Sequence, residues 1–264
     1  MSNVVLTDRE DGILTITMNR PDALNALDME LSDALNEAIQ TAEQDTEIRC
    51  VVIRGGEQFM AGGDLKWFSE NLVGNSDEMR IKFENFINQV HRMIISIRRM
   101  PKPVVASVSG PAAGFGLSLT MACDLVIAAD NSFFTLAYVN IGASPDGGST
   151  FALPRILGSK KAAEIAFLGD RFDAATAKEL GLVNWVVPVE DLKNETGKLA
   201  TRLAKGPTAV LGRTKSLLQQ SLNTTLESQL QAEATNFAVS AGEADFAEGI
   251  SAFIAKRKPK FIGK

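Results

Sequence analysis

The chain contains 264 residues, of which 45% are hydrophobic, so it can bury the core of one large domain, with or without a smaller appendage. Lysine and arginine total 27 and aspartate and glutamate total 32, giving a net charge of −5 and a pI of about 5.1, which argues against a nucleic-acid-binding surface. His91 is the single histidine and the two cysteines have no ligand spacing, so we expect no metal site.

The chain starts with MSNVVLTDRE, which lacks the basic segment and apolar stretch of a signal peptide. No apolar run reaches the ~20 residues needed to span a bilayer. Cys50 and Cys123 each lie in an apolar run, as expected of small buried thiols in a reducing compartment. We therefore expect a cytoplasmic protein that binds neither membrane nor nucleic acid.

Expected strands and helices alternate along the chain up to residue 188. In order, they are two short strands within residues 3–19 around a turn at Asp11-Gly12, a helix over 28–43, a buried strand over 49–56, a long helix over 77–99, a strand over 103–110, a helix ending near 122, a strand over 124–129, helical segments after 149 and a last strand within 181–188. From about residue 189 the pattern is entirely helical. This order predicts an α/β core followed by a helical C-terminal piece.

Two glycine turns follow strands, FMAGGDL at residues 59–65 and GPAAGFG at residues 110–116. Small residues let a ligand approach the backbone closely, and a turn that leads into a helix presents free N–H groups. Two such turns could hold one oxygen between two N–H donors, although each turn alone is better interpreted as an ordinary strand-to-helix turn. Neither turn fits the motif of a P-loop or of a dinucleotide fold.

Asp146, in IGASPDGGST, is the only carboxylate between Asp130 and Glu164. Pro-Asp-Gly is turn chemistry, so Asp146 could cap a helix that starts near Gly148. Its neighbours are largely apolar, which disfavours the charged carboxylate and strengthens it as a base. On the residues alone, the helix cap is the preferred role of Asp146.

Several segments resemble the enoyl-CoA hydratase/isomerase, or crotonase, superfamily over almost the whole chain. They are RPDALNAL, FMAGGDL, PKPVVASVSGPAAGFGLSLTMACDLVIAAD, GASPDGGSTFALPRILG, ATAKELGLVNWVVP and AEGISAFIAKRKPKF. The resemblance implies a spiral of ββα units over residues 1–195, a helical trimerisation region over residues 196–264, and acyl-CoA thioester substrates. It also implies that the N–H groups of Gly63 and Phe115 bind the thioester oxygen.

The two glutamates that the family's hydratases use are absent, because Ser118 and Tyr138 stand at their places. The turn SPDG is instead similar to that of the Δ3,Δ2-enoyl-CoA isomerases and of the ring-epoxide isomerases of phenylacetyl-CoA breakdown, where one acid stands at the position of Asp146. The resemblance therefore predicts a 3-enoyl-CoA to 2-enoyl-CoA isomerase in which Asp146 shuttles the proton.

Two alternatives remain open at this stage. The 4-chlorobenzoyl-CoA dehalogenases have a nucleophilic aspartate at the place of Asp146 and a histidine at the place of His91, so Asp146 could attack an aryl carbon. Alternatively, the protein could bind acyl-CoA without catalysis. Tyr138 reads either as a site acid or as a core aromatic residue.

The resemblance also suggests which residues bind substrate. They are Ala23, Leu24, Ala26, Ala61 and Asp64 along coenzyme A, and Ser118 and Tyr138 near the reacting carbons. Trp67, Phe68, Met79 and Phe83 are candidates for the acyl end, and the tail with Lys256 and Arg257 could meet the nucleotide phosphates or be solvated. We expect no cofactor beyond the coenzyme A of the substrate, and a homotrimer or hexamer.

Overall fold

A computed structural model describes residues 4–264, so Asn3 of the first expected strand lies outside the described residues. The strands are β1 (Val5–Glu10), β2 (Ile13–Met18), β3 (Cys50–Gly55), β4 (Val104–Val108), β5 (Pro111–Ala113), β6 (Leu125–Ala129), β7 (Phe133–Thr135), β8 (Phe172–Asp173) and β9 (Trp185–Val187). The α-helices are α1 (Met29–Gln44), α2 (Leu65–Asn71), α3 (Ser76–Arg99), α4 (Phe115–Ala122), α5 (Ser149–Leu168), α6 (Ala174–Glu179), α7 (Leu192–Ala204), α8 (Thr208–Ser221), α9 (Leu226–Ala241) and α10 (Ala244–Ile254). Short 3-10 helices are η1 (Pro21–Ala23), η2 (Tyr138–Ile141) and η3 (Val189–Asp191).

The chain winds as a spiral between two sheets. One sheet has the order β1-β2-β3-β4-β6-β9, antiparallel between β1 and β2 and parallel beyond, and the other has the order β5-β7-β8. After β4 the chain enters the second sheet as β5 and returns through α4 to β6. After β6 it enters the second sheet again as β7, continues through α5 to β8 of the same sheet, and returns through α6 to β9. These repeated turns are the ββα units that the resemblance implied.

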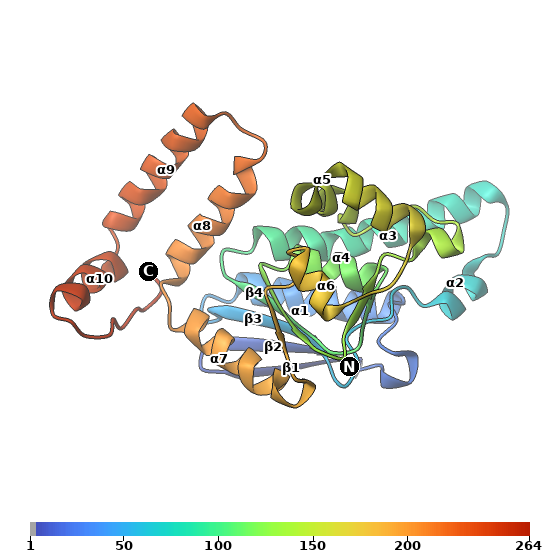
Figure 1. Ribbon diagram of the computed structural model, residues 1–264, viewed down its shortest axis with the longest axis horizontal. Helices are drawn as coiled ribbons and strands as arrows, with labels where there is room; N and C mark the ends of the chain where they lie inside the picture. The colour runs from blue at the N-terminus through green and yellow to red at the C-terminus, as the bar shows by residue number, and fades with distance from the viewer. Residues whose placement is uncertain (1–3) are drawn as a thin grey trace.

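Alternating side chains of the six-stranded sheet pack on its two faces, as the period of a strand requires. Val51 and Ile53 of β3 belong to the main core, together with residues of α1, α3 and α4. Cys50 and Val52 face the other way and pack with Ala200 of α7. Figure 1 shows α7 on one side of this sheet and α1, α3 and α4 on the other.

Most expected elements are present at the expected places. Asp28 caps α1 by accepting a hydrogen bond from the Leu31 N–H at 2.9 Å, and Asn75 caps the long helix α3. The sequence reading did not separate β5, β7 and β8 as strands, because segments of two or three residues carry no measurable alternation.

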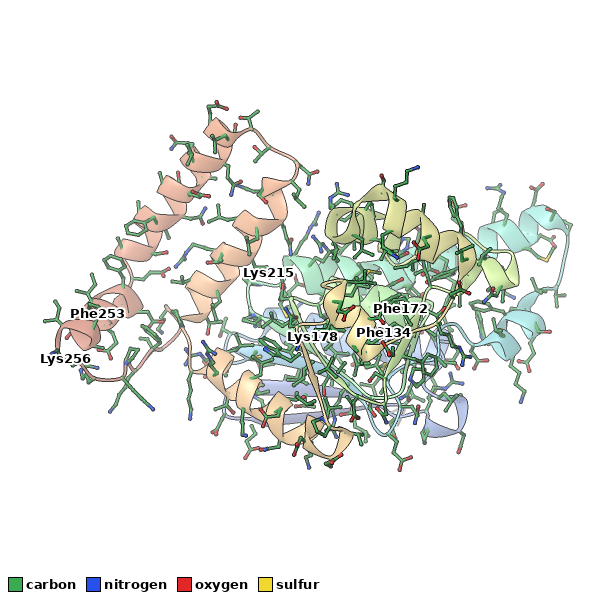
Figure 2. The ribbon with its side chains drawn as sticks, in the orientation of Figure 1. Phe134, Phe172, Lys178, Lys215, Phe253 and Lys256 are labelled. Carbon is green, nitrogen blue, oxygen red and sulfur yellow. The ribbon has the colours of Figure 1, made fainter. Side chains whose placement is uncertain are left out.

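The last three helices leave the core, with α8 and α9 as an antiparallel pair and α10 folded back near the C-terminus (Figure 1). The predicted boundary between residues 195 and 196 falls inside α7, which still packs on the sheet. In Figure 2, Lys215 lies where α8 meets the core, and its ammonium group is 2.8 Å from the Asp124 carboxylate. Over residues 4–264, no helix is long and apolar enough to cross a bilayer.

Helices α8, α9 and α10, which we call the C-terminal arm, expose many large apolar side chains. They include Leu218, Leu222, Leu226, Leu230, Phe237, Phe253 and Ile254. Such a surface on a chain of this size is typical of a protein–protein contact. The trimer expected from the resemblance stays a prediction.

Candidate active site

A largely apolar cavity of about 850 Å³ lies between the two glycine turns, α2, α3 and the segment that carries Asp146. Its lining residues come from every part of the core: Leu27, Ala61, Gly62, Gly63, Leu65, Phe68, Ser69, Leu72, Phe83, Phe86, Ile87, Val90, His91, Gly114, Phe115, Ala137, Tyr138, Ile141, Ala143, Ser144, Pro145 and Asp146. Within residues 4–264, Asp146 is the only acidic residue in this lining. The size and lining are those of a small-molecule site.

The backbone of Asp146 is held in place by hydroxyl groups. Its carbonyl oxygen accepts hydrogen bonds from Ser118 Oγ at 3.0 Å and from Ser149 Oγ at 2.9 Å. The N–H of Gly147 donates to Nε2 of His91 at 3.2 Å. These contacts join the turn to α4, α5 and α3, so the position of Asp146 is fixed from three helices.

The Asp146 carboxylate does not cap the following helix. Gly148 occupies the N-cap of α5, which has no side-chain cap, and Asp146 contributes only its carbonyl oxygen there. The hypothesis that Asp146 serves as an N-cap is therefore wrong. The side chain is available to the cavity instead.

Tyr138 is the hydrogen-bond partner of the carboxylate. Its hydroxyl donates to Oδ1 of Asp146 at 2.5 Å, in the range of a charge-assisted bond. Ser118 Oγ lies 3.5 Å from the same hydroxyl. Tyr138 also lines the cavity, whereas Ser118 lies behind it and does not.

Burial raises the pKa of Asp146 above its ordinary value, and the hydrogen bond from Tyr138 and the nearby His91 lower it in part. Burial, followed by the charge of Asp146, raises the pKa of Tyr138 well above its ordinary value. The tyrosine therefore keeps its proton at neutral pH and donates it in the hydrogen bond. The carboxylate becomes a stronger base than an exposed aspartate, as its apolar neighbours in the sequence predicted.

The two glycine turns lie against each other. Met60 and Ala113 are joined by a backbone hydrogen bond of 3.0 Å, and a side chain on Gly62 would meet the Ala113 carbonyl oxygen at 3.1 Å. Gly63 and Phe115 both line the cavity, and neither N–H has an acceptor in the described part of the chain. The Phe115 ring is 3% exposed and packs beneath Gly147.

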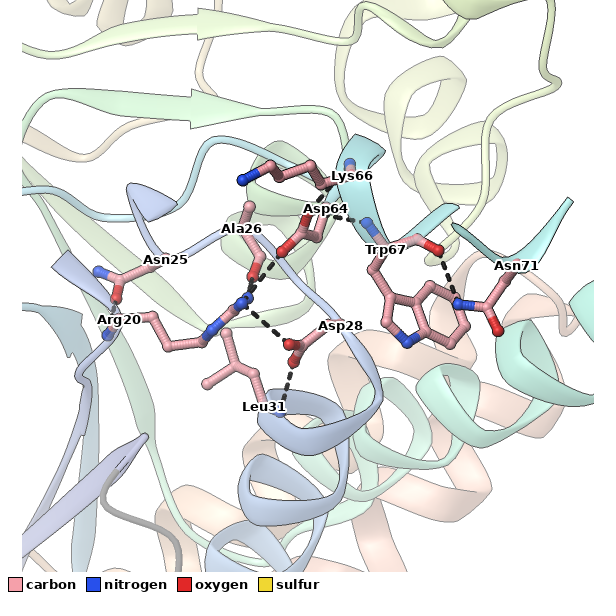
Figure 3. A network of polar contacts seen from close by, with 9 residues as sticks. All are labelled: Arg20, Asn25, Ala26, Asp28, Leu31, Asp64, Lys66, Trp67 and Asn71. Atoms are coloured by element: carbon pink, nitrogen blue, oxygen red, sulfur yellow. Dashed lines mark hydrogen bonds and ion pairs between the residues drawn. The ribbon is translucent and has the colours of Figure 1, made fainter. Parts of the chain in front are cut away.

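Arg20 fixes the first glycine turn to the segment before α1 (Figure 3). Its guanidinium lies 2.9 Å from Asp28 Oδ2 and 3.0 Å from Asp64 Oδ2, and it also donates to the Ala26 carbonyl. Asp64 in turn caps α2 through the N–H groups of Lys66 and Trp67. Burial alone would raise the pKa of Asp64, but the Trp67 N–H and Arg20 hold it below its ordinary value.

Of the residues expected along coenzyme A, Ala61 lines the main cavity and Leu24 lines a neighbouring hollow. A second hollow of about 350 Å³ is lined by Leu24 and Arg171 and shares Ala61 and Ala137 with the main cavity. Ala23, Ala26 and Asp64 line neither hollow. They build the backbone around Leu24, whose carbonyl accepts from the Ala61 N–H at 3.0 Å.

Aromatic rings close one end of the cavity. Phe68 and Phe83 meet edge to face with centroids 5.5 Å apart, and Phe86 lies beside them. The ring centroids of Trp67 and Phe86 are 4.8 Å apart, and neither Trp67 nor Met79 lines the cavity. The sequence pattern named Phe68 and Phe83, but it missed Phe86 and Arg20. The sequence placed Phe86 only within the long helix, and it placed Arg20 only as the first residue of RPDALNAL, with no role of its own.

Comparison with known proteins identifies the fold and the family. The sequence model described as enoyl-CoA hydratase/isomerase matches residues 8–264. The chain belongs to this family. The expected crotonase fold is confirmed by a Mycobacterium abscessus structure titled as a putative enoyl-CoA hydratase/isomerase, which has a TM-score of 0.93 and 31% identity and covers 98% of this chain and 100% of the other.

Two curated relatives of this crotonase show how wide the chemistry of the superfamily is. The 1,2-epoxyphenylacetyl-CoA isomerase of Escherichia coli K12 is 37% identical over 265 residues and covers 100% of both chains. The 4-chlorobenzoyl coenzyme A dehalogenase-2 of an Arthrobacter species is 34% identical over 253 residues, which are 96% of this chain and 91% of the other. The chain is therefore a crotonase-superfamily enzyme, and its own residues must decide between isomerase and other chemistry.

Proposed function

We propose that the protein is an acyl-CoA isomerase that moves a double bond from C3 to C2 of an enoyl thioester. The observation that carries the proposal is that Asp146 is the only acid lining the cavity among residues 4–264. Hydration needs two groups, one that activates water and one that moves a proton at carbon. Isomerisation needs only the group that moves a proton at carbon. Ser118 and Tyr138, at the places of the two hydratase glutamates, are both hydrogen-bonded to Asp146 and supply no further carboxylate.

The reaction that we propose keeps all atoms of the substrate. Asp146 removes a proton from C2, and the electron pair of the C–H bond enters a dienolate that extends from C4 to the thioester oxygen. The same carboxylic acid then returns the proton to C4, which leaves the double bond between C2 and C3. The raised pKa of Asp146 favours the first step, because a buried carboxylate is a stronger base.

The negative charge that develops on the thioester oxygen needs hydrogen-bond donors that are already in place. We assign this role to the N–H groups of Gly63 and Phe115. Both line the cavity and have no acceptor in the described part of the chain, and the hydrogen bonds between the two glycine turns fix their relative position. A preorganised donor of this kind typically contributes ~10²–10³ to the rate.

Coenzyme A would reach the site past the hollow of Leu24, Ala61 and Arg171, which shares the lining residues Ala61 and Ala137 with the main cavity. Lys256 and Arg257 lie elsewhere in the same chain. Figure 2 shows Lys256 beside α10, at the opposite end of the molecule from α2, and Arg257 pairs with Glu248 at 2.6 Å. A contact of this tail with the nucleotide would therefore need a second subunit.

One observation favours a second candidate, a dehalogenase-like hydrolase with Asp146 as nucleophile. His91 lines the cavity close to Asp146, and two Arthrobacter relatives named as dehalogenases are each 34% identical. However, His91 Nε2 accepts the hydrogen bond of Gly147, so this nitrogen is already used to hold the turn. Only Nδ1 of His91 then remains for other contacts. We rank the isomerase first because a single carboxylate, Asp146 within residues 4–264, suffices to move a proton between two carbons.

The experiment separates these activities by their products. The protein is incubated with a 3-enoyl-CoA, a 2-enoyl-CoA and 4-chlorobenzoyl-CoA, and the products are identified by mass spectrometry and chromatography. We expect the 3-enoyl thioester to become its 2-enoyl isomer without change of mass, and Asp146→Ala to abolish this conversion. The matched control is Asp8→Ala, which removes an exposed carboxylate on β1.

Other products would refute the proposal in distinct ways. Addition of water to the 2-enoyl thioester would identify a hydratase, and release of chloride would identify the hydrolase. An absence of turnover with all three substrates, together with tight binding of the thioesters, would favour a non-catalytic binding protein.

A further inference from the structure

The hydrogen bond from Tyr138 makes the two carboxylate oxygens of Asp146 inequivalent. Oδ1 accepts the tyrosine hydroxyl at 2.5 Å, whereas Oδ2 has no hydrogen-bond partner in the described part of the chain. Asp146 lines the cavity, so the oxygen without a partner is the one left to meet a substrate.

The tyrosine itself is rigidly placed. Its backbone begins η2, and the carbonyl of Tyr138 accepts hydrogen bonds from the N–H groups of Gly142 and Ala143, the latter at 3.1 Å. The preceding residue, Ala137, has φ of 46°, a left-handed conformation that costs a non-glycine residue energy. Strain of this kind persists where the surrounding structure holds it, and it gathers at functional sites.

The backbone of Asp146 is held independently of its carboxylate. Ser118 and Ser149 bind its carbonyl oxygen, and His91 binds the next N–H. These contacts fix the Cα atom and leave the carboxylate free to rotate about the side-chain bonds. Of the described residues, only Tyr138 restrains that rotation by a hydrogen bond.

We propose that Tyr138 is a positioning residue that holds Oδ1 of Asp146, so that Oδ2 alone carries the proton between C2 and C4 of the substrate. This inference rests on the proposed isomerase function. A base that serves two carbons must keep one oxygen over both of them, and a freely rotating carboxylate spends much of its time in other orientations. The hydrogen bond also keeps the proton of Tyr138 out of the reaction.

The same bond sets the acidity of the base. Burial raises the pKa of Asp146, and the hydrogen bond from Tyr138 opposes that rise by stabilising the carboxylate. The other titratable residue in the cavity lining is His91, which lies on α3. Removal of the tyrosine hydroxyl should therefore raise the pKa of Asp146 further. The loss of activity that follows protonation of Asp146 at low pH should then begin closer to neutral pH.

The first test needs no turnover. Tyr138 is the only tyrosine of the chain, so labelling tyrosine with ¹³C at Cζ gives one NMR signal from this residue. We expect its chemical shift to change with pH when Asp146 ionises, with a midpoint above the ordinary aspartate pKa, and to lose this transition in Asp146→Asn. A shift that does not titrate, or that titrates equally in Asp146→Asn, would show that the hydroxyl is not bound to this carboxylate.

The second test is the kinetics of Tyr138→Phe with a 3-enoyl-CoA. We expect kcat to fall roughly tenfold or more at neutral pH with KM nearly unchanged, since a hydrogen bond to a charged group is worth that much. The acidic limb of the pH profile should move to higher pH. The control is Ser132→Ala, which removes a buried hydroxyl bound to the Val108 carbonyl outside the cavity lining.

The outcomes separate this inference from the function on which it rests. If the wild type does not isomerise the substrate, the proposed function fails, and the NMR titration still decides whether the bond exists. If the wild type is active and Tyr138→Phe keeps both its kcat and its pH profile, the positioning role is wrong while the isomerase stands. A fall in kcat that Ser132→Ala matches would mean a structural effect and would also overturn the role.

Discussion

Gly147 allows the turn that carries Asp146 to lie close to α4. Its φ is +61°, and a Cβ atom at this position would lie 2.6 Å from Cβ of Ser118 and 3.0 Å from the ring of Phe115. Ordinary contact begins near 3.4 Å. Both neighbours belong to a buried helix in a packed core, so in Gly147→Ala the turn itself must move by about 0.8 Å or more.

The expected result is an enzyme that folds but reacts slowly. The left-handed backbone costs alanine ~1–2 kcal/mol of stability. Misplacement of a catalytic group by ~1 Å costs about 10² in rate, which is the fall in kcat/KM that we expect. Isomerisation of a 3-enoyl-CoA is followed by the near-ultraviolet absorption of the conjugated product, and the free energy of unfolding is measured with urea on the same samples.

The matched control is Gly181→Ala. Gly181 has φ of +77°, and its added Cβ would meet only Ile156 at an ordinary 3.9 Å. This control should lose similar stability and keep the wild-type rate. If Gly147→Ala keeps the wild-type rate, or if Gly181→Ala loses as much, the placement of Asp146 by close packing of this turn is refuted.

Three further predictions concern the acidity of Asp146, the ion pair between Lys215 and Asp124, and the exposed helices α8 to α10. Asp146 must be ionised to accept a proton, and its pKa is raised. The value of kcat/KM should therefore fall as the pH decreases through a pKa higher than that of an ordinary aspartate. A pH profile that stays flat down to the ordinary aspartate range would contradict this. Lys215→Ala removes a buried ammonium group that donates to Asp124 and to the Ile97 carbonyl, while the Asp124 side chain stays 23% exposed. It should cost ~1.5–3 kcal/mol in urea unfolding, whereas a loss below ~0.5 kcal/mol would show that the pair is not needed. Phe253 is 87% exposed on α10, so Phe253→Asp should weaken self-association measured by sedimentation without unfolding the core, and an unchanged sedimentation coefficient would place the subunit contact elsewhere.

Sequence patterns predicted the elements that are long or strongly periodic. Helices α1 and α3 follow from the spacing of their apolar residues, and β3 and β4 follow from short runs of apolar residues. The second sheet was not predicted, because β5, β7 and β8 span two or three residues each. Their pairing depends on how the spiral brings distant segments together, and no local pattern encodes it.

The site shows the same division between local and long-range information. Asp146, Gly63 and Phe115 stand in turns whose residue types stand out in the sequence, and all three line the cavity. The bond from Tyr138 to Asp146 was not foreseen, since it requires the left-handed Ala137 and the turn at residues 145–148 to converge. Arg20 was missed for the same reason, as its partners lie on separate segments.

The most direct test of the account compares wild type with Asp146→Asn in a single turnover of a 3-enoyl-CoA. Asparagine keeps the size of the side chain and can still accept the Tyr138 hydroxyl, but it cannot take up a proton from carbon. We expect the rate to fall by ~10²–10⁴ while thioester binding and stability are kept. A rate within about threefold of wild type would contradict the claim that Asp146 moves the proton.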